Sequence, residues 1–193
     1  RSSYSLLQII ELLENSQKDF FLVFAHVEDE NGLWRELKGG RIGELGQKER
    51  FKRNVLAFQK VRTNGPAEQG RPCRTKVKSW LQGWYPAEVE GSDCKSIADI
   101  GKGKPCYIKL GDFSFYALKY ALKDYPHHVS TEMPEYHHSY IKSISFEGGK
   151  LDGRTINFSP ELNTLIGIRG SGKSSVLEAL RYGLGIAFGD KAL

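Results

Sequence analysis

The sequence has few cysteines and no long hydrophobic run, and these absences exclude several classes of protein. The three cysteines, Cys73, Cys94 and Cys106, form no C-x-x-C pair, so they predict neither a zinc finger nor a disulfide framework. No apolar run has the length of a membrane span, and no signal peptide is visible. We therefore expect a cytoplasmic protein with no membrane partner. Because the chain begins at Arg1 rather than at methionine, we also expect a fragment of a longer protein.

Charge is distributed unevenly along the chain. The net charge is +5, but residues 35–78 hold 13 Lys and Arg against 4 Asp and Glu, a balance of +9. Several aromatic residues lie in or just after this segment, among them Phe58 and Trp84. Basic and aromatic side chains together can follow a phosphate backbone and stack on bases, so DNA or RNA is an expected partner. A solvated basic surface is an equally compatible interpretation, because clustering in sequence is not clustering in space.

The hydrophobic pattern predicts an α/β fold. Residues 4–14 have the apolar density of a helix with a buried face, and residues 20–25 are typical of a strand that is covered on both faces. Residues 35–46 are charged and rich in glycine, so we expect a loop there. The remaining expected elements are helices near 47–53 and 113–122 and strands near 55–58, 89–93, 107–109, 140–146 and 154–158.

A segment rich in proline and histidine, residues 125–138, is typical of a linker between domains. It divides the chain into predicted domains of residues 1–136 and 137–193. The segment contains two pairs of adjacent histidines, His127 with His128 and His137 with His138. Because these pairs lack the i, i+4 spacing of a helical metal site, we interpret them as solvated linker residues.

The most specific motif is GIRGSGKS at residues 167–174, which fits the phosphate-binding P-loop pattern G-x-x-x-x-G-K-[ST]. An apolar run at 162–166 before it predicts a buried strand, and residues 174–184 after it predict a helix. Glycines let backbone N–H groups turn toward a phosphate, and a helix N-terminus attracts the same anion. The expected nucleotide-binding residues are Gly167, Arg169, Gly170, Ser171, Gly172, Lys173, Ser174 and Ser175.

Two of these residues have specific expected roles. The Lys173 ammonium group should reach the β- and γ-phosphates of ATP, and the Ser174 hydroxyl should coordinate Mg²⁺. The role of Arg169, at the crown of the loop, stays open. A small-molecule kinase or a GTPase is a less favoured interpretation of the same loop.

Residues 139–188 resemble the start of an ABC-type ATPase head of the SMC and DNA-repair group. In that group, two strands precede an "LN-x-(I/L)-x-G" strand and a glycine-rich loop. Asn163 and Gly167 match this pattern, whereas Arg169 replaces the usual Asn. The resemblance implies ATP and Mg²⁺ as cofactors and a head-to-head homodimer of the full-length protein. The chain contains neither the Asp-Glu strand end nor the signature loop of such heads. We therefore expect weak nucleotide binding and no turnover by this chain alone.

In the first domain, His26 and Asp93 each follow a predicted strand. A single histidine at such a position is commonly a hydrogen-bonded structural residue. The two segments nevertheless resemble the later part of a PHP phosphoesterase domain, a distorted (β/α) barrel with metal ligands at the strand ends. The resemblance implies His26 and Asp93 as ligands of Zn or Mn. Lys95, however, stands where that family has a metal-binding histidine, which argues against a complete site.

Together, the two parts resemble the TrlF-like PHP–ATPase proteins. The expected fold is thus a partial PHP-like barrel followed by the first strands, P-loop and first helix of an ATPase head. Further matches are the segments at 107–109 and 113–122. The resemblance implies ATP-dependent nucleic-acid processing in DNA repair or bacterial defence, coupled to a phosphoesterase or nuclease. The alternative is an ATP-gated nucleic-acid-binding or scaffold module with a degenerate PHP domain.

Overall fold

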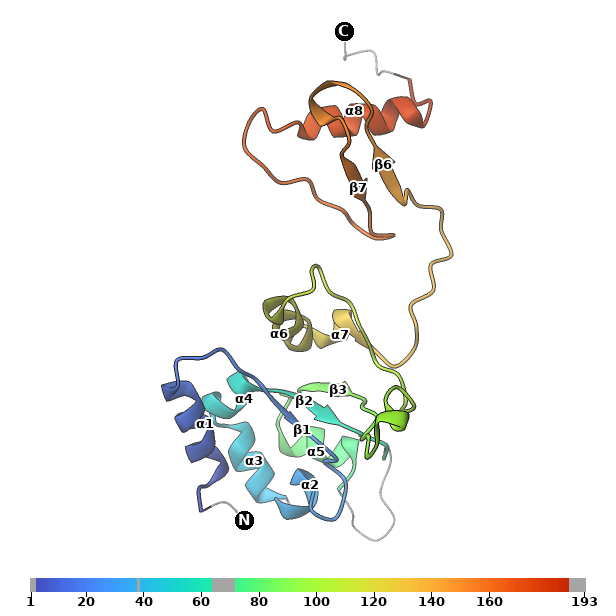
Figure 1. The fold of residues 1–193 in the computed structure, drawn as a ribbon. Helices are drawn as coiled ribbons and strands as arrows, with labels where there is room; N and C mark the ends of the chain where they lie inside the picture. The colour runs from blue at the N-terminus through green and yellow to red at the C-terminus, as the bar shows by residue number, and fades with distance from the viewer. Residues whose placement is uncertain (1–2, 38, 64–71, 188–193) are drawn as a thin grey trace. The chain divides into compact units, whose positions relative to one another are not determined.

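The computed structural model describes residues 3–37, 39–63 and 72–187 (Figure 1). The chain divides into two compact units, which we call unit 1 (Arg1–Pro134) and unit 2 (Glu135–Leu193). Both contain helices and small sheets, so the α/β class is confirmed. The described residues close no barrel, because the largest sheet has three strands. The identities of the two predicted domains, 1–136 and 137–193, stay predictions.

Unit 1 is built on a parallel sheet with the strand order β1 (Leu22–Phe24), β2 (Val55–Gln59) and β3 (Ala87–Val89). Four consecutive residues of β2, residues 55–58, are buried, because packed elements cover both faces of the central strand. The strand expected at residues 55–58 is therefore confirmed. The expectation for β1 is wrong in one respect. β1 lies at the edge of the sheet, and its Val23 side chain is 42% exposed.

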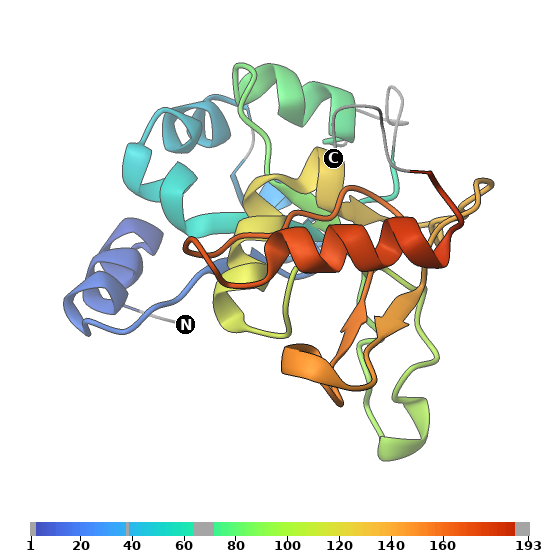
Figure 2. The same cartoon turned by 90° about the horizontal axis from the view of Figure 1, so that it is seen from above.

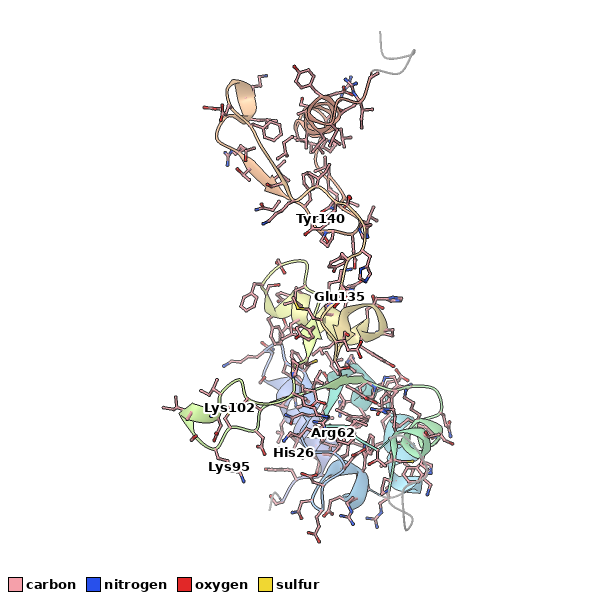
Figure 3. The ribbon with its side chains drawn as sticks, turned by 90° about the vertical axis from the view of Figure 1, so that its right-hand side faces the viewer. His26, Arg62, Lys95, Lys102, Glu135 and Tyr140 are labelled. Atoms are coloured by element: carbon pink, nitrogen blue, oxygen red, sulfur yellow. The ribbon has the colours of Figure 1, made fainter. Side chains whose placement is uncertain are left out.

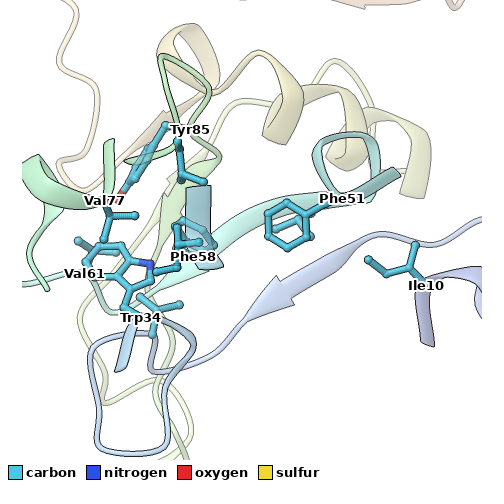
Figure 4. Close-up of a cluster of buried hydrophobic side chains, with 11 residues drawn as sticks. Ile10, Trp34, Phe51, Phe58, Val61, Val77 and Tyr85 are labelled. Atoms are coloured by element: carbon cyan, nitrogen blue, oxygen red, sulfur yellow. The ribbon is translucent and has the colours of Figure 1, made fainter. Parts of the chain in front are cut away.

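One face of this sheet carries the larger hydrophobic cluster, which Figure 4 shows in close-up. Trp34 and Phe58 meet edge to face in its centre, with ring centroids 5.8 Å apart. The Trp34 indole N–H is buried without a hydrogen-bond partner among the described residues. The helices of this half of unit 1 are α1 (Leu6–Asn15), α2 (Leu33–Glu36), α3 (Gly40–Gly46), α4 (Glu49–Asn54) and α5 (Arg74–Trp80).

The glycine-rich segment expected to be a loop forms helix α3, so that expectation is wrong. A Cβ atom on Gly46 would lie 2.6 Å from the Leu81 Cδ2 atom, and one on Gly43 would lie 3.1 Å from the Trp80 carbonyl oxygen. Glycine at these positions permits close packing of α3 against α5 and the residue that follows it. Tertiary packing thus outweighs the low helix propensity of glycine.

The other face of the sheet packs against helix α6 (Phe115–Lys123) through a smaller cluster that includes Leu56, Ala87 and Leu122. A short helix, α7 (Tyr125–His128), follows α6 directly. An antiparallel pair of strands, β4 (Tyr107–Ile108) and β5 (Val129–Ser130), flanks these helices, and a 3₁₀ turn, η2 (Ile97–Asp99), lies in the loop before β4.

Unit 2 contains an antiparallel hairpin and one long helix. Strands β6 (Ser143–Ser145) and β7 (Thr155–Asn157) pair with each other across a 3₁₀ turn, η3 (Gly149–Leu151). Helix α8 spans Lys173–Gly183, in agreement with the predicted helix. The buried strand expected at residues 162–166 is not formed, and Leu162 and Ile166 are 89% and 93% exposed. In the described part of unit 2, no other strand pairs with this segment.

Candidate functional site

The P-loop of unit 2 leads into the N-terminus of α8 (Figure 2). Its backbone turns through Gly170 and Gly172, with φ angles of +83° and +90°. These left-handed conformations are readily available only to glycine. Gly167 lies close to another residue of the loop, because a Cβ atom there would lie 2.6 Å from the Ser171 Oγ atom. The glycine spacing of the motif therefore corresponds to the curled path of the loop.

The Lys173 side chain reaches back over this loop. Its Nζ atom donates hydrogen bonds to the carbonyl oxygens of Gly167 at 2.7 Å and Ile168 at 2.8 Å. These bonds are charge-assisted, so they are stronger than bonds between neutral groups. Lys173 thus holds the first half of the loop against the start of α8, and places its positive charge inside the curl.

At the N-terminus of α8, the first backbone N–H groups have no acceptor among the described residues. The first bond that closes a helical turn runs from the Val176 N–H to the Gly172 carbonyl, 3.0 Å away. The N–H groups of residues 173–175 precede it, and Gly172, the N-cap residue, has no side chain to cap them. Val176 is buried and anchors the helix, whereas the side chains of Ser174 and Ser175 are exposed. Uncapped amides at the positive end of a helix dipole are a favourable place for an anion.

Two other residues of the motif region have distinct positions. Arg169 is exposed at the crown of the loop. Asn163 closes the turn before the loop. Its Oδ1 atom accepts from the Ser159 N–H, and its Nδ2 atom donates to the carbonyls of Ser159 and Glu161, all at 2.8 Å. Asn163 therefore shapes the segment that leads to the P-loop.

In unit 1, the structure brings His26 and Asp93 together at the carboxyl edge of the parallel sheet. The His26 Nε2 atom lies 3.4 Å from the Asp93 Oδ1 atom. Lys60, which directly follows β2, places its Nζ atom 3.6 Å from the other carboxylate oxygen, Oδ2. All three residues have positive φ angles, of +48°, +50° and +57° for His26, Asp93 and Lys60. Such non-glycine conformations are strained, and strained residues are frequent at functional sites.

The positive charge beside Asp93 comes from a lysine side chain, Lys60. The Lys60 ammonium group, and secondly His26, hold the pKa of the Asp93 carboxyl below its ordinary value. Asp29 lies on the other side of the imidazole, with its Oδ2 atom 3.5 Å from His26 Nδ1. Figure 3 shows His26 in unit 1 and Lys95 on the loop that follows β3. A pocket of about 590 Å³ opens beside His26, Asp29 and Asp93.

This arrangement does not fit the zinc or manganese site that the family resemblance implies. Lys60 already neutralises the Asp93 carboxylate that a metal would need, and a protonated amine has no lone pair to donate. Within the described ranges, no three or more His, Cys, Asp or Glu residues form a group that could hold a metal ion. Lys60 was not predicted as a site residue from the sequence. It directly follows strand β2, and a position after a strand is the same signal that identified His26.

The segment predicted to be a linker contains helix α7 with His127 and His128, and its four histidines do not gather into a site either. The His128 ring nitrogen Nδ1 is 2.8 Å from the Lys109 carbonyl oxygen, and His138 Nε2 is 2.7 Å from the Pro160 carbonyl oxygen. The His137 side chain is 85% exposed. The interpretation of these residues as solvated linker residues is therefore wrong for His128 and His138, whose rings contact backbone carbonyl oxygens.

Comparison with known proteins adds one match. Residues 140–191, just over a quarter of the chain, match the model of a family described as an AAA domain. The match supports an ATPase-type, nucleotide-binding character for this segment, and Mg²⁺ is the usual companion of the nucleotide in such domains. It gives no support to a PHP-like assignment of residues 1–136. No curated protein and no solved structure matches the chain. None of the described helices could cross a membrane.

Proposed function

We propose that residues 167–175 bind the phosphates of ATP together with Mg²⁺, and that unit 2 is the nucleotide-binding part of an ATPase. The observation that carries this proposal is the uncapped N-terminus of α8, which follows two left-handed glycines and lies beside the Lys173 ammonium group. Backbone donors and a fixed positive charge are the groups that a triphosphate requires. The AAA-domain match over residues 140–191 supports the same function.

Each residue of the loop has a distinct task in this proposal. The N–H groups of residues 173–175 donate to phosphate oxygens. Lys173 exchanges its bonds with the Gly167 and Ile168 carbonyls for bonds with the β- and γ-phosphates. The exposed Ser174 hydroxyl coordinates Mg²⁺, which screens the charge of the phosphates. Arg169, Gly170 and Ser171 border the phosphates at the crown of the loop.

Titration of the chain with a fluorescent ATP analogue in the presence of Mg²⁺ tests the proposal. We expect Lys173→Ala to weaken binding at least about tenfold, because it removes a charge-assisted contact worth about 1.5–3 kcal/mol. Lys150→Ala is the matched control, because Lys150 is an exposed lysine in the turn between β6 and β7 of the same unit. Equal affinities of the wild-type chain and the Lys173→Ala variant would contradict the proposal.

We further propose that the protein couples this nucleotide site to nucleic acid, in the cytoplasm and as a head-to-head dimer. The basic character of unit 1 supports a nucleic-acid partner. The Lys60–Asp93 ion pair favours a binding or scaffold role for unit 1 over metal-dependent phosphoester cleavage. Metal analysis of the purified chain after incubation with Mn²⁺ or Zn²⁺ tests this preference. Stoichiometric metal that is lost in an Asp93→Asn variant would restore the phosphoesterase interpretation.

A further inference from the structure

A basic surface of unit 1 extends from the amino ends of β1 and β2, beside Phe20 and Asn54, to the side of β3, beside Glu88. It consists of three adjoining pockets of about 350, 170 and 450 Å³. The first and second pockets share Arg53 and Lys123, and the second and third share Tyr85 and Tyr125. We call this surface the amino-edge groove.

Positive charge dominates the lining of the amino-edge groove. Its seven cationic residues are Lys18, Lys52, Arg53, Arg74, Lys78, Lys119 and Lys123. Its three anionic residues are Glu14, Asp19 and Glu88. The groove therefore has a balance of +4. Four of these cations come from the basic segment of residues 35–78, and the other three come from outside it.

The three carboxylates are already engaged with residues at the groove. Glu14 accepts hydrogen bonds from Arg53 and from the Asn54 amide. Asp19 accepts from the Tyr116 hydroxyl at 2.7 Å and from Lys119 at 3.4 Å.

The third carboxylate, Glu88, binds the Arg74 guanidinium group through both of its oxygens and also accepts from the Tyr85 hydroxyl. Lys18, Lys78 and Lys123, in contrast, are exposed and form no ion pair with the described carboxylates. No described carboxylate neutralises their charge, and so it is available to a polyanion; the Lys78 Nζ atom also lies 4.8 Å from the centroid of the Tyr85 ring.

Aromatic rings lie between the basic ends of the groove. Trp84 and Tyr125 line the narrow middle pocket, and both are half-buried. Trp84 packs edge to face on Phe51, with centroids 5.5 Å apart, which fixes the orientation of its indole ring. A pocket of this size admits a flat group but not a double helix. Proteins that bind single strands use such an arrangement: the bases stack on fixed aromatic rings, and the lysines on either side contact the phosphates.

We propose that the amino-edge groove binds single-stranded nucleic acid, with Lys18, Lys123 and Lys78 at the phosphates and Trp84 and Tyr125 at the bases. This inference deepens the nucleic-acid function proposed above and rests on it. The aromatic middle pocket favours a single strand over an acidic protein segment, which would use the lysines but has no bases to stack. It also favours a single strand over a duplex, whose bases are already stacked.

Fluorescence anisotropy with a labelled oligothymidine tests the proposal on the complete chain, without nucleotide, over a series of NaCl concentrations. For a double Lys18→Ala, Lys123→Ala variant, we expect a salt slope that is shallower by about 1.4, because each phosphate contact with a single strand contributes about 0.7. The same relation predicts a loss of affinity of roughly 25-fold at 0.1 M salt. A double Lys95→Ala, Lys102→Ala variant removes the same charge from the exposed loop labelled in Figure 3 and should bind as the wild type does.

Ultraviolet cross-linking of the wild-type complex, followed by peptide mass spectrometry, provides a readout that needs no variant. We expect cross-links at Trp84 or Tyr125. Cross-links confined to unit 2 or to the loop at residues 91–104 would overturn the proposal. Equal weakening by the two double variants, tighter binding of a duplex, or complete competition by polyglutamate would do so as well.

The test is independent of the nucleotide site. Lys173→Ala should bind oligothymidine as tightly as the wild type does, because Lys173 lies in unit 2. If the groove variants bind normally while Lys173→Ala still loses ATP, the groove proposal fails and the ATP proposal stands. If the groove variants lose oligothymidine while Lys173→Ala binds ATP normally, the groove proposal stands and the ATP proposal fails.

Discussion

At the scale of single residues, Lys60 decides the character of the strand-end cluster in unit 1. Its ammonium group lies 3.6 Å from the same carboxylate that a metal site would use. We therefore expect a Lys60→Met substitution to raise the pKa of Asp93, because Lys60 is the largest cause of its depression. Carbon-13 NMR titration of the side-chain carboxyl measures this directly. An unchanged pKa would show that Lys60 does not contact Asp93 in solution.

A second prediction at this scale concerns the ion pair between Arg62 and Glu90. The Glu90 side chain is only 7% exposed, and its hydrogen bonds with Arg62 hold its pKa below the ordinary value of 4.5. A carboxyl whose pKa is lowered by folding stabilises the native state above its unfolded pKa, and this contribution is lost as the pH falls through the folded pKa. An Arg62→Met variant should therefore be least stable relative to wild type near pH 7.

Urea denaturation between pH 2 and pH 7 measures this difference. The difference in the free energy of unfolding should shrink below about pH 4, because Glu90 takes up a proton first in the variant and then, as the pH falls further, in the wild type as well. Arg41→Met serves as the control, because Arg41 is exposed on α3 and should give a difference near zero at every pH. A difference that stays constant with pH would rule out the ion pair as its cause.

At the scale of secondary structure elements, helix α1 depends on its first residues. Ser5 caps the helix by accepting from the Gln8 N–H at 3.3 Å, and the Gln8 side chain accepts from the Ser5 N–H at 2.8 Å. Ser5→Ala removes half of this capping box and should lower the free energy of unfolding of unit 1 by about 1 kcal/mol. Chemical denaturation measures the loss. Ser3→Ala, an exposed serine before the helix, should change the stability by less than a few tenths of that amount.

The same scale shows which parts of the fold could be predicted from the sequence. Helix α1, strand β2, the hairpin β6–β7 and helix α8 follow from local apolar periodicity and capping, and they form close to where they were expected. Helix α3 could not be predicted, because its glycines are explained only by a neighbour distant in the sequence. The strand expected at residues 162–166 does not form. Its apolar pattern needs a neighbouring strand in a sheet, and the described residues provide none.

The candidate sites differ in how far the sequence could predict them. The P-loop residues are neighbours in the chain, so one motif predicts all of them together, and their role in nucleotide binding stays a prediction. The cluster of His26, Asp93 and Lys60 joins the ends of three separate segments of unit 1. The amino-edge groove likewise takes Lys18 and Lys123 from outside the basic segment that the composition identifies.

At the scale of the whole molecule, the two units differ in how much apolar surface they bury. Unit 1 contains two hydrophobic clusters around its sheet, whereas Val176 is the only core residue in the described part of unit 2. We therefore expect the amides of β2 to exchange with solvent much more slowly than those of β6 and β7, because exchange follows the free energy of local opening. Hydrogen–deuterium exchange with peptide-level mass spectrometry tests this expectation. Equal protection of both sheets would contradict it.

The central claim is that backbone amides at the start of α8, with Lys173, hold the phosphates of a nucleotide. Amide NMR shifts on addition of ATP and Mg²⁺ test it most directly, with adenosine as the control that lacks phosphates. The account predicts the largest shifts at Gly170 to Ser175 with ATP, and none there with adenosine. Shifts of these amides that are equal for ATP and adenosine, or that are absent while other residues respond to ATP, would contradict it.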